Sequence, residues 1–309
     1  MSKTGIPYLD EVLNVTSGCT KISEGCANCW ASDLHRRFHG QPYDVNCPIK
    51  MHPKRLEEAL HWRKPRRAGV CFTSDLFHDQ VPDEFIDKVF AVMALTPQHT
   101  YMLLTKRPER MRAYLKEAAP RIDQQVLNDC EDRCTGTDAY VLSYRWPLPN
   151  VWLGVSAESQ ARADERIPLL LDTPAAHRWV SLEPMLGPIG ISRWLTDRHI
   201  YADDPFHYPI PDDRGLDWVV IGGESGPKAR PCDLEWIRDV RDQCKAAGTP
   251  CYVRQTGSGY ASMLSCSLAL QGVPKDRWPD SKGEDIVFWP PDLRVREWPK
   301  ETSDARILH

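Results

Sequence analysis

Residues 99–118, HTYMLLTKRPERMRAYLKEA, contain one complete unit of the pattern that decides the fold. The apolar run over His99–Leu104 predicts a β-strand, and the polar residues 105–107 follow it. Pro108 suits the first turn of an amphipathic helix, because a backbone amide at that place would have no partner. The stretch therefore predicts a strand that ends in Thr-Lys-Arg and leads into a helix over Pro108–Ala118.

The same strand-and-helix pattern recurs along most of the chain. Six more strands are predicted, over Glu11–Val15, Gly69–Thr73, Val151–Val155, Arg178–Ser181, Trp218–Ile221 and Cys251–Arg254. Further helices are predicted over Pro82–Leu95, Ser159–Leu171 and Asp233–Ala247. This alternation implies parallel strands joined by helical crossovers. We therefore expect an α/β fold, a full or partial (β/α) TIM-type barrel, with its site at the carboxyl ends of the strands.

Two insertions and a tail interrupt this pattern. We expect the barrel to occupy residues 1–256, with an insertion at 123–145 and a long loop at 196–214. Residues 257–309 have recurring Trp-Pro pairs and little periodicity, which predicts an irregular extension packed on the barrel. Cys130 and Cys134, in the insertion, are the closest pair among the other cysteines, and their role stays open.

Composition limits the cellular setting. No apolar run reaches the roughly 18 residues of a membrane span, and the N-terminus has no signal-peptide core. We therefore expect no membrane contact and a cytoplasmic location, the host cytoplasm if the gene is carried by a phage. Thiols stay reduced there, so the 11 cysteines are expected to be core residues or metal ligands rather than disulfides.

The net charge is −4, yet cations cluster locally. The residues concerned are Arg63, Lys64, Arg66 and Arg67 in one cluster and Lys106, Arg107, Arg110 and Arg112 in another. Either cluster is able to bind the phosphates of a nucleic acid despite the negative total. The alternative for each cluster is a solvated helix end or loop.

The predicted strands end in side chains capable of chemistry. These strand-end residues are Asp75, Lys106, Arg107, Ser156, Glu158, Glu183, Gly222, Gly223 and Glu224. Because the carboxyl ends of barrel strands meet at one mouth, we expect these residues to gather around one site. For Glu183 and Glu224 the alternative is a buried salt bridge within the barrel.

Three cysteines near the N-terminus form a metal-binding pattern. Cys19, Cys26 and Cys29 have the spacing C-x6-C-x2-C, and thiolates are ligands for iron–sulfur clusters or zinc. Three cysteines would hold three irons of a [4Fe-4S] cluster and leave the fourth iron open to a small molecule. The alternatives are a structural zinc site completed by His35 or His39, and inert core thiols.

Four blocks of the sequence resemble a known family. They are GCTKISEGCANCW (18–30), FTSDLFHDQVPDEFIDKVFAVMALTPQHTYMLLTKRPERM (72–111), VWLGVSAESQARADERIPLLLDTPAAHRWVSLEPMLGPI (151–189) and DWVVIGGESGPKARPCDLEWIRDVRDQCKAAGTP (217–250). The family they resemble is phage-borne and of formerly unknown function. It is regarded as a distant relative of radical S-adenosylmethionine enzymes and is compared with spore photoproduct lyase.

The resemblance implies a [4Fe-4S] cluster on Cys19, Cys26 and Cys29, with S-adenosylmethionine bound beside it. The usual superfamily spacing is C-x3-C-x2-C, so the first gap is longer here. Asn28 stands where the superfamily tends to place an aromatic residue near the adenine. Trp30 follows the third cysteine instead, and it either packs on the adenine or belongs to the core.

The resemblance also implies roles for the strand-end residues. Val219–Glu224 resembles the superfamily strand that ends near the adenine in Gly-x-x-Glu, although one residue here separates Gly222 from Glu224. Ser156 and Glu158 would bind ribose hydroxyls and Asp75 the methionine ammonium. Lys106 or Arg107 would pair with the methionine carboxylate. The last strand of the family often ends in Lys-Gln-Trp, where this chain has Arg-Gln-Thr at 254–256.

For the reaction, the resemblance points to phage DNA. The implied activity is a radical isomerisation of an amino-acid-substituted thymine, driven by an external one-electron reductant, with the base flipped out of the duplex. Alternatives are a lyase that repairs thymine lesions, as spore photoproduct lyase does, and a radical enzyme acting on a free nucleotide or peptide. A zinc-stabilised nucleic-acid-binding module without catalysis is the alternative from another class.

Overall fold

The computed structural model describes residues 4–44, 46–131, 146–195 and 215–299. The predicted loop at 196–214 lies outside these residues, as does the part of the predicted insertion from residue 132 to 145. Cys134 and the side chain of Cys130 lie outside the described part as well.

Within the described residues, seven strands form one sheet in the order β1-β4-β5-β6-β7-β8-β9, and the pairs resolved in register are parallel. The strands are β1 (Glu11–Leu13), β4 (Arg67–Val70), β5 (Thr100–Thr105), β6 (Val151–Ser156), β7 (His177–Leu182), β8 (Trp218–Gly222) and β9 (Cys251–Gln255). Each overlaps a predicted strand. A sheet order that follows the chain is that of a barrel, whereas a doubly wound sheet reverses at a switch point. The predicted α/β partial barrel is thus confirmed.

The predicted helices are also present. They are α3 (Asp83–Leu95), α4 (Pro108–Glu117), α6 (Gln160–Leu171) and α7 (Leu234–Ala247). Helix α7 shows why they form where they do: the Asp233 side chain accepts a hydrogen bond from the amide of Glu235, and Gly248, with φ 71°, ends the helix in the left-handed conformation.

Four further helices lie outside the sequence predictions. They are α1 (Trp30–His39), α2 (Leu56–Leu60), α5 (Ala119–Glu131) and α8 (Ser258–Leu270). Within the described ranges, every helix is too short or too polar to span a bilayer.

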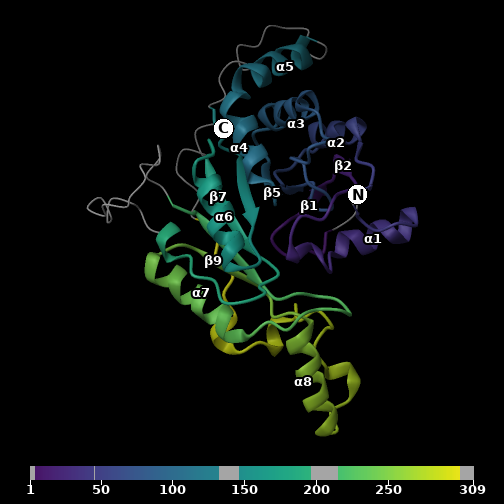
Figure 1. The fold of residues 1–309 in the computed structure, drawn as a ribbon, viewed down its shortest axis with the longest axis vertical. Helices are drawn as coiled ribbons and strands as arrows, with labels where there is room; N and C mark the ends of the chain where they lie inside the picture. Colours follow the sequence, from purple (N-terminus) through teal and green to yellow (C-terminus); the bar gives the residue numbers. More distant parts are fainter. Residues whose placement is uncertain (1–3, 45, 132–145, 196–214, 300–309) are drawn as a thin grey trace. The chain divides into compact units, whose positions relative to one another are not determined.

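The chain divides into two compact units. The first comprises residues 1–21, 31–155 and 169–178, apart from the stretches outside the description. It holds β1, β4 and β5 and an antiparallel ribbon of β2 (Thr16–Ser17) and β3 (Lys50–Met51). Helix α3 packs against α2 and α5 in this unit (Figure 1).

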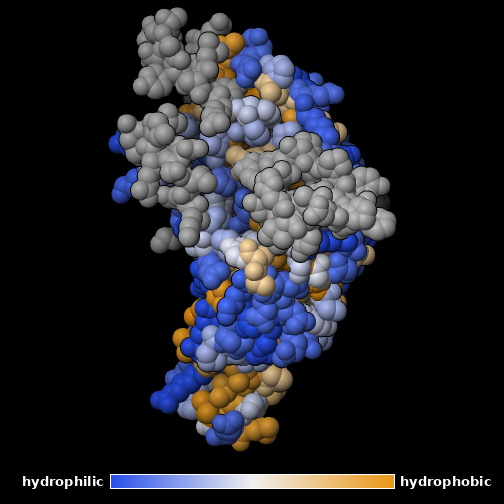
Figure 2. All heavy atoms as spheres, turned by 90° about the vertical axis from the view of Figure 1, so that its left-hand side faces the viewer, coloured by the Kyte–Doolittle hydropathy of each residue, from blue (hydrophilic) through white to orange (hydrophobic). Residues whose placement is uncertain are grey.

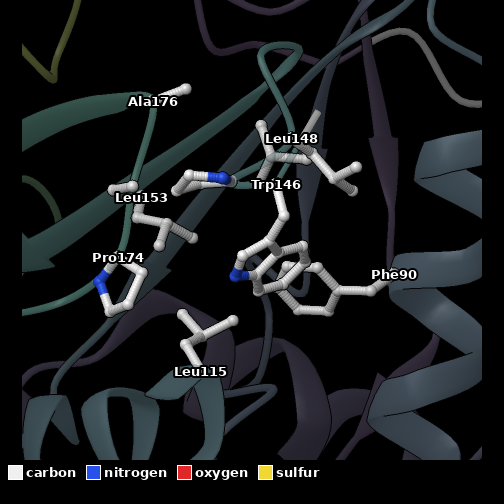
Figure 3. Close-up of a pocket in the computed structure, with 10 residues that line it drawn as sticks. Phe90, Leu115, Trp146, Leu148, Leu153, Pro174 and Ala176 are labelled. Carbon is white, nitrogen blue, oxygen red and sulfur yellow. The ribbon is translucent and has the colours of Figure 1, made fainter. Parts of the chain in front are cut away.

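Figure 3 shows a small pocket in this first unit. It is lined by Phe90, Leu115, Trp146, Pro147, Leu148, Val151, Leu153, Pro174, Ala175 and Ala176. The side chains are aromatic, proline and aliphatic, so the pocket is a gap in the hydrophobic packing and offers nothing for acid, base or metal chemistry.

The second unit comprises residues 22–30, 156–168 and 179–309, again apart from the stretches outside the description. Helix α7 packs on β8 and β9 (Figure 1). The tail runs along β9, where Val295 accepts and Glu297 donates backbone hydrogen bonds of 2.8 and 2.9 Å. The ring of Trp298 then stacks on that of Trp218, with centroids 4.9 Å apart. The extension thus covers the exposed side of β9.

The expected irregular structure holds for only part of this extension. Residues 257 onward were expected to be irregular, but the 13-residue helix α8 comes first, and short 3-10 helices follow. The sequence SGYASMLSCSLAL has no charged residue, so it has no polar face by which a helix is recognised. Met263 is 62% exposed and Leu270 is 90% exposed, and Figure 2 shows apolar atoms gathered over α8.

Candidate functional site

The cysteine motif is divided between the two units: Cys19 belongs to the first, whereas Cys26 and Cys29 belong to the second. All three are half-buried thiols. Each part is held by buried ion pairs of its own unit, and the two parts are described in turn.

Arg107, just after β5, holds the segment around Cys19. Its Nη1 donates to Cys19 Sγ at 3.9 Å, and its Nη2 donates to the carbonyl and hydroxyl oxygens of Thr20 at 3.2 and 2.8 Å. Burial alone would lower the pKa of Arg107, but the negative charges of Asp75 and Cys19 raise it. A guanidinium in this place favours the thiolate form of Cys19, which is the form that binds metals.

Asp75 fixes Arg107 in turn. Its Oδ2 accepts from Arg107 Nη1 at 3.1 Å and from the Lys106 amide at 3.1 Å. Its Oδ1 accepts from the Thr105 hydroxyl at 2.8 Å and from the Phe77 amide at 3.0 Å. Asp75 and Arg107 were expected to bind opposite ends of a methionine. The structure places them in contact with each other, with side chains 7% and 9% exposed.

His78 is a residue of this region that sequence reasoning missed. Its Nδ1 accepts from the amide of Gln80 at 3.2 Å, and its Nε2 lies 3.0 Å from the Thr20 hydroxyl. Burial lowers the pKa of His78, and the positive charge of Arg107 lowers it further. A neutral imidazole with its proton on Nε2 therefore donates to Thr20. Its position three residues after Asp75, beyond a strand end, was the available signal.

The second unit holds the loop with Cys26 and Cys29 through a buried carboxylate. The Gly25 amide donates to Glu158 Oε1 at 3.0 Å, and Glu158 Oε2 pairs with Arg166 Nη1 at 3.0 Å. The side chains of Glu158 and Arg166 are 0% and 1% exposed. Arg166 also donates to the carbonyl of Ser156 at 2.6 Å. Glu158 comes directly after β6 and Arg166 lies on α6, so one strand–helix unit supports the loop.

Glycine is required at position 25. A Cβ on Gly25 would come within 2.8 Å of Glu158 Cδ, closer than real side chains approach. The loop backbone therefore lies directly on the carboxylate. Glu158 was predicted to bind ribose hydroxyls, whereas the structure shows its two oxygens on Gly25 and Arg166.

Glu224, after β8, holds the other end of the same loop. Its Oε2 accepts from Asn28 Nδ2 at 3.0 Å, and Arg230 binds both oxygens, with Nη2 at 2.6 Å from Oε1. Burial alone would raise the pKa of Glu224, but the hydrogen bonds of Arg230 and Asn28 lower it. Asn28 immediately precedes Cys29. Trp30, which follows, is 53% exposed, so it is not a core residue.

Glu24 ties the loop to α6 from outside. Its carboxylate accepts from the Ser159 hydroxyl at 2.7 Å and from Arg162 Nε at 3.1 Å. The Ser159 hydrogen bond, ahead of that of Arg162, lowers the pKa of Glu24 to about 2. Arg230 donates to the Glu24 carbonyl at 3.0 Å, so the Glu224–Arg230 pair contacts both sides of the loop.

The remaining predicted residues of the second unit form a separate group at the ends of β7, β8 and β9. Glu183 accepts from Arg254 at 2.6 Å, and its carbonyl accepts from the Ser156 hydroxyl at 3.3 Å. A Cβ on Gly222 would lie 2.9 Å from Glu183 Oε1, and one on Gly223 would lie 2.6 Å from a backbone carbonyl. Both glycines are therefore required for close packing of these strand ends.

The cations predicted to bind nucleic acid are mostly paired. Arg66 pairs with Glu11, and Arg67 pairs with Asp10 at 3.2 Å. Both lie at the start of β4, whereas Asp75 follows its other end. Arg63 and Lys64 are exposed.

The second predicted basic cluster is paired as well. Arg110 donates to the carbonyls of His78 and Val81 and pairs with Asp83 at 2.6 Å. Arg112 pairs with Asp172 at 3.0 Å. A nucleic-acid role for either cluster stays a prediction.

In the part of the chain that the structure describes, no three His, Cys, Asp or Glu side chains are arranged to hold a metal ion. The three motif thiols are nevertheless partly exposed and held in two braced segments. Soft sulfur donors on fixed backbone suit an iron–sulfur cluster or zinc.

Comparisons with known proteins give one family and two distantly similar solved structures. A family model described as "Protein of unknown function (DUF5131)" matches residues 3–279. A spore photoproduct lyase complexed with dinucleoside spore photoproduct is similar at 11% identity and a TM-score of 0.43, over 82% of this chain and 78% of that chain. A mutant spore photoproduct lyase with bound AdoMet and dinucleoside spore photoproduct is similar at 12% identity and a TM-score of 0.44, over the same shares, 82% and 78%. No curated protein matches the chain.

Proposed function

We propose that this chain, which belongs to the DUF5131 family of proteins of unknown function, is a radical S-adenosylmethionine enzyme whose [4Fe-4S] cluster is held by Cys19, Cys26 and Cys29. The observation that carries the proposal is the bracing of the motif. Two buried carboxylates from strand ends, Glu158 and Glu224, bind the backbone and Asn28 of one short loop. A chain gains little from such bracing unless the loop must hold its thiols in fixed places.

The proposed cluster sets the tasks of the surrounding residues. When bound, it would supply one electron, received from an external reductant, for cleavage of S-adenosylmethionine to a carbon radical. Arg107 would keep Cys19 in its thiolate form. Glu158 and Glu224 would position the loop of Cys26 and Cys29. Cluster sulfur and thiolate would carry negative charge, and the Arg107 guanidinium beside Cys19 would offset part of it.

S-adenosylmethionine itself would then be bound by the strand-end residues that the bracing does not use. These are Lys106, Ser156, Glu183, Gly222 and Gly223. Gly222 and Gly223 would contribute backbone groups only, because the space where a Cβ would stand is filled by Glu183 and by the Thr256 carbonyl. Asp75, Arg107, Glu158 and Glu224, proposed for the same cofactor from the sequence, are assigned here to the cysteine motif because of their contacts.

For the substrate, we propose thymine in DNA, and a radical isomerisation of an amino-acid-substituted thymine as the reaction. Support comes from the family resemblance of the sequence blocks. A lyase acting on a thymine lesion is the second candidate, and a free nucleotide or peptide substrate is the third. A zinc-stabilised binding module is the alternative without catalysis.

Anaerobic reconstitution tests the cofactor assignment. The purified chain should take up about four irons and four sulfides and absorb near 400 nm. With dithionite and S-adenosylmethionine it should release 5′-deoxyadenosine. Cys26→Ala should lose both properties, whereas Cys266→Ala, an exposed cysteine on α8, should keep them. A colourless protein with one zinc and no iron would refute the proposal.

A label test addresses the substrate separately. DNA whose thymine carries an N-linked amino-acid substituent deuterated at the α-carbon should transfer deuterium to 5′-deoxyadenosine, because moving the link from nitrogen to carbon takes a hydrogen from that α-carbon and none from the thymine methylene. An enzyme that cleaves S-adenosylmethionine but takes no deuterium from DNA, and does so from a free nucleotide or a peptide, would contradict the DNA assignment and leave the radical chemistry in place.

A further inference from the structure

A basic surface with an exposed aromatic ring lies on the first unit, apart from the clusters that the sequence suggested. It consists of the last turn of α1 and the segment of β3 and the 3-10 helix that follows it. We call these residues the α1–β3 surface: Arg36, Arg37, Phe38, His39, Lys50, Met51, His52, Lys54 and Arg55. All except the half-buried His52 are exposed.

Contacts on both sides hold the two segments of this surface in place. Behind α1, the His35 ring packs on the rings of His39 and Tyr43, with centroids 4.5 and 4.9 Å apart. The Tyr43 amide donates to Ser32 at 2.9 Å, which turns the chain back along the helix. Lys50 pairs with Ser17 in the β2–β3 ribbon.

His52 directly follows β3 and lies near enough to His39 of α1 for the charge of that residue to act on it. Its Nε2 is 2.8 Å from the Ser17 hydroxyl. Burial lowers the pKa of His52, and so do the positive charges of Arg55, Lys50 and His39, in that order. The charged groups that act on this imidazole from α1 and from β3 are thus all cationic. The two segments together form one region of positive electrostatic potential.

The charge of the surface contrasts with that of the whole chain. Residues 31–55 contain five Lys and Arg and two Asp, a net charge of +3, in a chain of net charge −4. One of the two carboxylates, Asp33, pairs with Arg36 at 2.8 Å. The cluster at the start of β4 differs, since Arg66 and Arg67 are matched there by Glu11 and Asp10. A local excess of cations attracts a polyanion despite a negative total.

Helix stability explains part of this arrangement but not all of it. Cations in the last turn of a helix interact well with the helix dipole, which accounts for Arg36 and Arg37. It does not account for Phe38, which lies between Arg37 and His39 and is 76% exposed. Proteins that bind single-stranded nucleic acid combine cations, which bind the phosphates, with aromatic rings, which stack on the bases.

The surface also borders the segment that leads to Cys19. Gly18 has a φ of 87°, and the Pro48 carbonyl occupies the place where a Cβ would stand. The residues just before β3 therefore lie against Gly18, which precedes Cys19 in the sequence. A strand held on the α1–β3 surface would therefore pass beside one end of the cysteine motif.

From these observations we infer that the α1–β3 surface binds a single strand of DNA, with its phosphates on Arg36, Arg37, Lys50, Lys54 and Arg55 and one base stacked on Phe38. The inference deepens the proposed function and rests on it for the choice of DNA. The inference does not require the [4Fe-4S] cluster, because every residue proposed to contact the DNA belongs to the α1–β3 surface of the first unit.

Fluorescence anisotropy with the full chain tests it. The probes are a labelled 12-nucleotide single strand and the duplex of the same sequence, titrated from 50 to 200 mM salt. Arg36→Ala with Arg37→Ala should weaken single-strand binding at least tenfold and lower the slope of log K against log salt by about 1.4. Phe38→Ala should weaken it by roughly 5- to 150-fold with the salt slope unchanged, since it removes stacking and no charge.

The matched control is Lys88→Ala with Lys116→Ala, which removes two exposed cations of the same unit, on α3 and α4, outside the surface and outside the clusters that the sequence suggested. It should bind as the wild type does. The inference is overturned if this control loses affinity while the surface variants keep it, or if the wild type binds neither probe at 50 mM salt. Competition by polyglutamate as strong as that by an unlabelled oligonucleotide, with Phe38→Ala neutral, would overturn it in favour of an acidic protein partner.

Iron content is measured on the same preparations, so absence of a cluster with intact DNA binding would refute the proposed function alone.

Discussion

Glu158→Gln is the substitution that examines the bracing of the cysteine loop most directly. Glutamine keeps an acceptor for the Gly25 amide, but it leaves the Arg166 guanidinium buried without its counter-charge. Both side chains are almost fully buried, at 0% and 1% exposure, so solvent does not screen the loss. Removing one partner of such a pair costs about 3–5 kcal/mol. We expect the free energy of unfolding in urea to fall by that amount, out of a typical total of about 5–15 kcal/mol.

A second variant separates stability from positioning. Replacing the pair by Glu158→Leu with Arg166→Met removes both charges, and such replacements are often neutral for stability. The Gly25 amide would still lack its acceptor, so the loop should remain loose. In apo-protein, iodoacetamide should therefore alkylate Cys26 and Cys29 faster than in the wild type, as followed by mass spectrometry. Arg162→Ala, which breaks partly exposed pairs with Glu24 and Glu165, should cost less than about 1 kcal/mol.

Two results would refute the reasoning. One is a loss below about 1 kcal/mol for Glu158→Gln, which would mean that the buried pair is compensated elsewhere. The other is an unchanged alkylation rate in the double variant, which would mean that Glu158 does not position the loop.

Other predictions follow from the same contacts. Gly25→Ala should displace the loop from Glu158 and cost about 1–3 kcal/mol in urea unfolding, whereas Gly187→Ala, with open space at its Cβ, should not. Arg107→Gln should slow alkylation of Cys19 at pH 7, because it removes the positive charge that favours the thiolate, and Arg112→Gln should leave that rate unchanged. For Glu24, the folded-state pKa lies at about 2, below the ordinary 4.5, so its contribution to stability is present above pH 4.5 and is lost as the pH falls towards 2. Glu24→Gln should flatten the urea-unfolding profile over that range, and a profile equal to that of the wild type would contradict the assignment.

The strands were predictable because their apolar runs are long and each is followed by a polar turn. Val151–Val155 and Trp218–Ile221 needed only local sequence, and the structure extends each by one residue. Helix α8 was missed because it lacks a polar face, and β2 and β3 are two residues each, too short to give an alternating pattern.

The site was predictable in its residues but not in its contacts. Strand ends pointed to Asp75, Glu158 and Glu224, yet the Gly25–Glu158 hydrogen bond joins residues 133 apart in sequence. No local pattern specifies such a pair. Arg166 left a usable signal, since it lies beside Ile167 among the buried residues of α6, where a cation needs a partner. When a single cation lies on an apolar helix face, its buried partner is therefore to be sought at the end of the strand that precedes the helix.

The tail along β9 has a consequence for anyone who shortens this chain. The family match stops at residue 279, and a truncated chain designed from that match would end there. Such a chain would lack the backbone partners at Val295 and Glu297 and the Trp298 ring that lies on Trp218. It would present the bare edge of β9 beside the uncovered ring of Trp218, and an unpaired strand edge is a template for pairing between molecules. We expect it to form insoluble aggregates on expression, whereas the chain that extends through Trp298 keeps that edge capped by its own polypeptide.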